Sequence, residues 1–257
     1  MEHVEVMHHK HHDHFKGKEA IEHVIEARMK GHTATAEIHG TELPGHYSAA
    51  ADAAKETSLI LLILWTLFSE IGLPETQVHW LSLCFIVGWL FWKVGRSAIL
   101  GWSRLERLHR LIEEERWEIE HHRPQEREEL KALYAAKGFS GKLLEEAIDV
   151  LMADDNRLLK VMLEEELGLS LESYEHPLKQ AAGALVGVVG AALIMSLALF
   201  FLPWWGTLAC SALVIGLSAG SSAQLERNRP LPSIVWNLAV AALATGVAYF
   251  TAQILFL

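Results

Sequence analysis

The sequence predicts an all-α membrane protein with five transmembrane helices and a cytosolic helical insert between the second and the third. Three observations lead to this prediction. Half of the chain is hydrophobic (51%), and these residues are concentrated in long runs. A strongly charged stretch separates the first two runs from the last three. Lysine and arginine lie on only one side of the membrane if each run crosses it once.

Each apolar run approaches the roughly 20 residues that an α-helix needs to cross a bilayer core. The expected spans are residues 57–73, 80–100, 180–202, 206–223 and 233–257. We therefore divide the chain into four parts. They are a cytosolic His-rich tail with a surface helix (1–56), transmembrane helices 1–2 (57–100), a cytosolic carboxylate-rich helical domain (101–178) and transmembrane helices 3–5 (179–257).

The distribution of cations predicts the topology. Lysines and arginines precede the first span, follow the second, precede the third and separate the fourth from the fifth. The loops 74–79 and 203–205 contain none. Because cytosolic loops carry the excess of Lys and Arg, the N-terminus and the insert are expected in the cytosol. The C-terminus is expected on the opposite side of this multi-pass protein.

Glycine spacing indicates how the spans pack. Gly183, Gly187 and Gly190 recur in the third span, and Gly216 and Gly220 in the fourth. Small residues at such spacing allow helices to approach closely in a membrane.

Composition argues against several other classes of protein. The net charge of -10 does not suit a nucleic-acid partner, because phosphate binding needs clustered cations. The sequence contains no nucleotide-binding loop and no HExxH, so we expect no enzyme. Cys84 and Cys210 both fall within apolar runs, and no disulfide framework is expected.

The insert carries glutamate pairs that could bind a metal ion. Glu115 and Glu118 form one ExxE pair, and Glu126 and Glu129 form another. Residues three apart share a helical face, so each pair can present two carboxylates to one cation. Met162 precedes Glu164 to Glu166, and a thioether beside carboxylates favours a transition metal. The alternative is that these helices are solvated faces whose acids pair with neighbouring arginines.

Local signals predict four helices in the insert. Pro124 suits the first turn of a helix and separates the first two. Gly138 ends the second, and Ser140 and Asp154 are expected N-caps of the third and fourth.

The N-terminus is rich in histidine. Six histidines lie within residues 1–14, and clustered imidazoles can bind transition metals. Residues 15–30 are compatible with an amphipathic helix at the membrane surface.

The chain resembles the vacuolar iron transporter family from the second span to the C-terminus. The resemblance is strongest over residues 113–203. It rests on an ExxEI and ExxEL pattern around a proline, then a later Met and EELGL before a second proline. The matching residues are Glu115, Glu118, Ile119, Pro124, Glu126, Glu129, Leu130, Tyr134, Gly138, Met162, residues 165–169 and Pro177.

The resemblance implies a five-span homodimer in a lipid bilayer that exchanges ferrous iron for protons. Fe²⁺, with Mn²⁺ or Zn²⁺ as alternatives, would be the transported or bound ion. The resemblance also implies metal ligands in the insert at Glu115, Glu118, Glu126, Glu129, Met162 and Glu166, with Glu165 as a substitute for a glutamate that the family places at Leu163.

The first two spans depart from this family. They lack its Asp-Gly pair and its Met-Gly-rich run, so Glu56 and Glu70 are the carboxylates left to line a transport path. Lys93 and Arg96 would repel a cation that faced them. Two functional alternatives to a divalent metal transporter therefore stay open. One is a membrane-anchored protein that binds or senses metal without transport, and the other is a scaffold that binds none.

Overall fold

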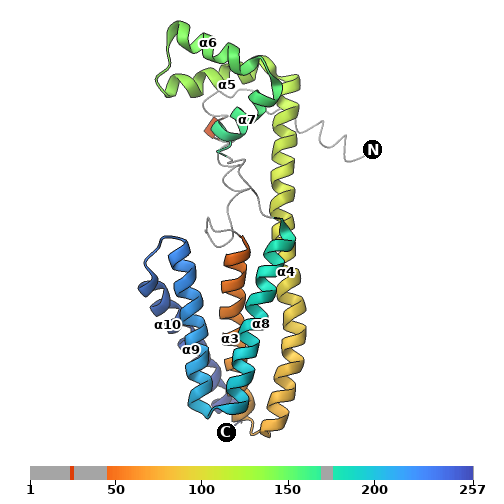
Figure 1. Ribbon diagram of the computed structural model, residues 1–257, viewed down its shortest axis with the longest axis vertical. Helices are drawn as coiled ribbons and strands as arrows, with labels where there is room; N and C mark the ends of the chain where they lie inside the picture. Colours follow the sequence, from red (N-terminus) through yellow and green to blue (C-terminus); the bar gives the residue numbers. More distant parts are fainter. Residues whose placement is uncertain (1–23, 26–44, 169–175, 257) are drawn as a thin grey trace, which may run out of the picture. The chain divides into compact units, whose positions relative to one another are not determined.

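The computed structural model describes residues 24–25, 45–168 and 176–256, and all regular structure within them is helical. The His-rich segment and most of the expected surface helix lie outside these residues. Figure 1 shows the helices with described bounds. They are α3 (Gly45–Glu70), α4 (Glu75–His121), α5 (Arg123–Ala136), α6 (Gly141–Met152), α7 (Asp155–Glu165), α8 (Pro177–Phe201), α9 (Trp204–Leu225) and α10 (Pro230–Phe256).

The chain divides into two compact units. The described part of the first, the insert unit, comprises residues 24–25 and 104–168. That of the second, the membrane unit, comprises residues 45–103 and 176–256. Helix α4 contributes its first part to the membrane unit and its last part to the insert unit.

Four described helices are long and apolar enough to cross a membrane: α4, α8, α9 and α10. Their outer faces carry large exposed apolar side chains, such as Phe91 and Leu243. Exposed aliphatic and aromatic side chains at this density suit a lipid environment. The chain is therefore a multi-pass membrane protein.

Helix α3 is the element that differs most from the sequence-based prediction. The first span was expected at residues 57–73, after a cytosolic tail with a surface helix (1–56). The helix instead begins at Gly45 and ends at Glu70. Alanines dominate its first turns, and alanine has the highest helix propensity, so the polar segment continues the helix. The charged residues of α3 also explain why it is not among the four helices that are long and apolar enough to cross a membrane. The fifth span therefore stays a prediction.

Helix α3 lies among the other helices of the membrane unit, against α8, α9 and α10. A Cβ atom at Gly183 or Gly187 on α8 would overlap the backbone carbonyl groups of His46 and Ala50 on α3. Glycine spacing thus identified this close approach correctly. It failed at Gly190, where no described atom lies within 4 Å of an added Cβ.

The insert unit follows its predicted helix boundaries closely. Helix α4 ends just before Pro124, which lies in the first turn of α5. Gly138 adopts a φ of 95° after α5, a conformation that glycine adopts without strain. Ser140 is the N-cap of α6, and the side chain of Asp154 caps α7 by accepting a hydrogen bond from the backbone N–H of Arg157 (2.8 Å). The sequence did not predict that α4 runs unbroken from residue 75 to residue 121.

Two apolar clusters hold the insert unit together. The first joins α4 to α7 and the chain just beyond it, and the second joins α4, α5, α6 and α7. The first consists of Leu108, Leu111, Leu163 and Leu167. The second consists of Ile119, Leu130, Ile148, Leu158 and Met162.

Candidate metal centre

A layer of glutamates lies between these two apolar clusters. On α4, Glu115 and Glu118 fall between Leu111, which belongs to the first cluster, and Ile119, which belongs to the second. A helix repeats every 3.6 residues, so these side chains share one buried face of α4. Five glutamates are buried in this layer or at the end of α7: Glu115, Glu118, Glu126, Glu129 and Glu166.

Three of these carboxylates converge from different elements. One oxygen from each of Glu115 on α4, Glu126 on α5 and Glu166 at the end of α7 lies within 4.8 Å of the others. Three ionised carboxylates at that separation repel one another by about 3.5 kcal/mol per pair at an effective dielectric constant of about 20. A proton or a bound cation would relieve this repulsion.

Glu126 is the carboxylate of this cluster with the most strongly perturbed surroundings. It is fully buried, and neither of its carboxylate oxygens has a hydrogen-bond partner among the described residues. Burial raises the pKa of Glu126 from 4.5 to about 10, and the negative charges of Glu115, Glu129, Glu166 and Glu118 add to this rise. A metal-free protein near neutral pH therefore keeps a proton on Glu126.

Met162 is the softer donor among the predicted ligands. It is fully buried in the second apolar cluster, one helical turn before Glu166 on the same face of α7. A thioether next to carboxylates favours a transition-metal ion over magnesium or calcium.

Glu165 has different surroundings from Glu166. It is half-buried, and its carboxylate forms an ion pair with the ammonium group of Lys137 after α5.

The ExxE pairs were also open to interpretation as solvated faces. Burial of both pairs argues against this, and Arg123 and Arg127 bind acidic residues of α6 and α7 instead, namely Asp155, Glu145 and Asp149.

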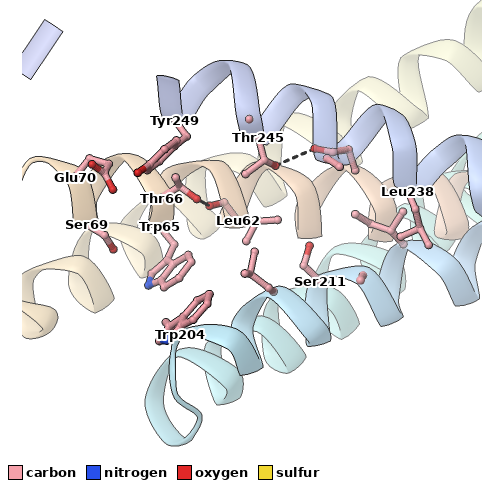
Figure 2. Close-up of a pocket in the computed structure, with 16 residues that line it drawn as sticks. Leu62, Trp65, Thr66, Ser69, Glu70, Trp204, Ser211, Leu238, Thr245 and Tyr249 are labelled. Carbon is pink, nitrogen blue, oxygen red and sulfur yellow. Dashed lines mark hydrogen bonds between the residues drawn. The ribbon is translucent and has the colours of Figure 1, made fainter. Parts of the chain in front are cut away.

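The two carboxylates expected along a transport path lie on α3. Glu56 forms an ion pair with Lys93 on α4, with 2.6 Å between Oε2 and Nζ. Glu70 accepts a hydrogen bond of 2.8 Å from the side-chain amide of Gln253 on α10. Glu70 also lines a cavity between α3, α9 and α10 (Figure 2). The sequence identified both acids but not their partners, because helix pairing is not encoded in local spacing.

The fold and these sites define a multi-pass helical membrane protein with a buried cluster of carboxylates in its polar unit. Residues 102–253, more than half of the chain, match the VIT family (vacuolar iron transporter). The chain belongs to this family, which indicates a membrane metal transporter rather than an enzyme. A comparison with curated proteins found no match.

Proposed function

We propose that this protein transports a divalent transition metal, ferrous iron or manganese, across a membrane in exchange for protons. The insert unit would bind metal from the cytosol, and the membrane unit would carry it across. The observation that supports this most is the convergence of three buried carboxylates from three elements, with the oxygens of Glu126 unpartnered within the described chain. A buried carboxylate without a hydrogen-bond partner, such as that of Glu126 among the described residues, suits a cation ligand.

The ligand set in this proposal is a group of five buried glutamates and one methionine. Glu165 is left out, because its carboxylate is paired with Lys137. The proposed ligands are Glu115, Glu118, Glu126, Glu129, Met162 and Glu166.

Proton exchange follows from the same site. The raised pKa of Glu126 means that a metal ion must displace its proton on binding. The insert unit would then couple metal capture to proton release. As the family resemblance implies, we further propose a homodimer in a lipid bilayer, with the insert and the N-terminus in the cytosol.

A transport assay with the full chain tests the proposal. Purified protein in liposomes loaded with a metal-quenched dye should show quenching on addition of Fe²⁺ or Mn²⁺, and a pH gradient should change its rate. The matched variant replaces Glu115, Glu118, Glu126 and Glu129 by Gln. It should lose saturable metal binding in detergent while the helical content is unchanged.

A second function is favoured by one observation. The ion pair with Lys93 occupies the carboxylate of Glu56, which is one of two acids available to a transport path. A membrane-anchored metal-binding or sensing protein would bind metal in the insert and show no flux. Saturable binding without quenching would establish that function and overturn transport, and the absence of both signals would leave a scaffold.

A further inference from the structure

His79 joins two helices of the membrane unit through its imidazole ring, which is half-buried. Its Nδ1 lies 2.6 Å from the backbone oxygen of Glu75, one turn earlier at the start of α4. Its Nε2 lies 3.0 Å from the backbone oxygen of Leu199, near the end of α8. The ring also stacks on that of Phe200, with 4.1 Å between the two centroids and 25° between the planes. These contacts hold the side chain between α4 and α8.

The carbonyl group of Leu199 needs a partner from outside its own helix. In an α-helix this oxygen would accept a hydrogen bond from the backbone N–H four residues later. That residue is Pro203, which has no N–H. The oxygen of Ala198, one residue earlier, is bonded to the N–H of Leu202 in the regular way (2.9 Å). The Nε2 atom of His79 therefore takes the place of the donor that Pro203 lacks.

Both partners of the His79 ring are carbonyl oxygens, and a carbonyl oxygen only accepts hydrogen bonds. A neutral imidazole has one N–H and one nitrogen lone pair, whereas the protonated ring donates from both nitrogens. In either neutral tautomer, one lone pair would face a carbonyl oxygen at hydrogen-bonding distance. The two contacts can therefore form together only when the ring is protonated.

The surroundings of His79 suit a cation. The end of α8 carries the negative partial charge of a helix C-terminus, which stabilises a protonated histidine. Glu75 adds a carboxylate on α4, and no Lys or Arg of the described chain lies at this end of the membrane unit. The titratable groups on the neighbouring helices are Glu70 on α3, Cys210 on α9 and Tyr249 on α10, and α8 has none after Lys179 near its start.

We propose that His79 is a proton-operated link at the end of the membrane unit where α4 begins and α8 ends. The protonated ring ties the two helices together, and loss of the proton breaks one of the two hydrogen bonds. A histidine ordinarily titrates at about pH 6.5, within the physiological range. In the predicted topology this end lies away from the cytosol, so the link responds to the pH on that side.

The link reaches beyond α4 and α8. Helix α8 contacts the backbone of α3 through Gly183 and Gly187, so release of its end changes the support that it gives to α3. The inference depends on contacts within the membrane unit and not on the proposed transport, so a protein without flux would still contain the link.

Thermal unfolding of the full chain in detergent tests the link. His79→Phe keeps a ring that can stack on Phe200 and removes both donors. It should lower the melting temperature by several degrees at pH 5.5. The loss should be clearly smaller at pH 8, because the neutral ring of the wild type keeps only one hydrogen bond. An equal loss at both pH values would show a merely structural role and overturn the proposal.

His121 provides the matched control. Its Nδ1 also lies near a backbone oxygen one turn earlier on α4, that of Trp117 (2.8 Å), and its ring stacks on the same residue. It is exposed, and no second carbonyl group is recorded at its ring. His121→Phe should therefore leave the melting temperature unchanged at pH 5.5 and at pH 8.

Nuclear magnetic resonance with ¹⁵N-labelled histidine observes the proton itself and does not depend on stability. The signals of His79 are those lost in His79→Gln, whose side-chain amide can still donate to the carbonyl of Leu199. At pH 5.5 both ring nitrogens should carry protons, and titration to pH 8 should remove one. A ring that keeps one protonation state across this range would overturn the proposal.

Discussion

The ammonium nitrogen of Lys93 lies 2.6 Å from a carboxylate oxygen of Glu56, so one membrane helix neutralises an acid on its neighbour. Lys93 is buried. The sequence suggested that this lysine would repel a metal ion. The structure shows that its ammonium group is paired with one carboxylate oxygen of Glu56. An ammonium group and a metal ion must therefore compete for the same carboxylate.

Removing Lys93 should favour metal at Glu56. Lys93→Met keeps the length and apolar character of the side chain and removes its charge, so the carboxylate gains affinity for a cation. We expect a higher initial rate of Mn²⁺ flux in liposomes at subsaturating metal. Glu56→Gln should abolish flux and lower the melting temperature, because it leaves a buried ammonium group unpaired. The double variant should recover the melting temperature without recovering flux. An unchanged rate in Lys93→Met would remove Glu56 from the predicted transport path.

Metal binding to the insert should depend steeply on pH. Because the pKa of Glu126 is raised to about 10, each metal ion that binds at neutral pH must release the proton of that carboxyl group. Affinity should fall by about tenfold per unit of pH below neutrality, corresponding to about one proton released per metal. Calorimetric titration with Mn²⁺ in two buffers of different ionisation enthalpy measures this number. A buffer-independent heat of binding would contradict the prediction.

Replacing the ionisable group of Glu126 should stabilise the metal-free protein. A carboxyl group with a raised folded-state pKa stabilises the fold below its unfolded pKa of 4.5, and this stability is lost as pH rises towards 10. At pH 7 the loss reaches up to about 3 kcal/mol at 1.36 kcal/mol per pKa unit. Glu126→Gln should therefore raise the melting temperature at pH 7 to 8 in chelator, and the difference should vanish near pH 4. Glu120→Gln, at an exposed position of α4, is the matched control and should show no change.

The contact between α3 and α8 should not tolerate side chains at its glycines. Gly187→Leu places a branched side chain against the backbone of Ala50, and overpacking of this kind costs about 1–3 kcal/mol or more. The melting temperature of the protein in detergent should fall by several degrees. Gly190→Leu should have little effect, because an added Cβ there meets no described atom within 4 Å. Equal effects of the two substitutions would show that the contact is not specific.

Much of the insert was predictable because its signals are local. A proline in the first turn, a glycine with positive φ and an aspartate cap each define a boundary within a few residues. The burial of the ExxE pairs was not predictable in the same way. The spacing of Glu115 and Glu118 puts them on one face of α4, and only tertiary packing decides that this face is covered.

Local sequence signals predicted less of the membrane unit. Hydropathy detects the apolar parts of α8, α9 and α10, but it misses the first three turns of α3, where alanine and charged residues alternate. The partner of Lys93 was not predictable for a related reason. A sequence shows a lysine near the end of an apolar run, and it does not show that an acid on another helix lies within hydrogen-bonding distance.

The convergence of Glu115, Glu126 and Glu166 has a further consequence for the lifetime of the protein. A metal ion held by all three would cross-link segments that lie up to about fifty residues apart in the sequence, as a disulfide bond does. Ligand-linked stabilisation grows with concentration and reaches about 2.7 kcal/mol at one hundred times the dissociation constant. The resistance of the insert to proteolysis would then rise and fall with the metal concentration around it, so the abundance of the protein would follow the supply of the metal that it binds.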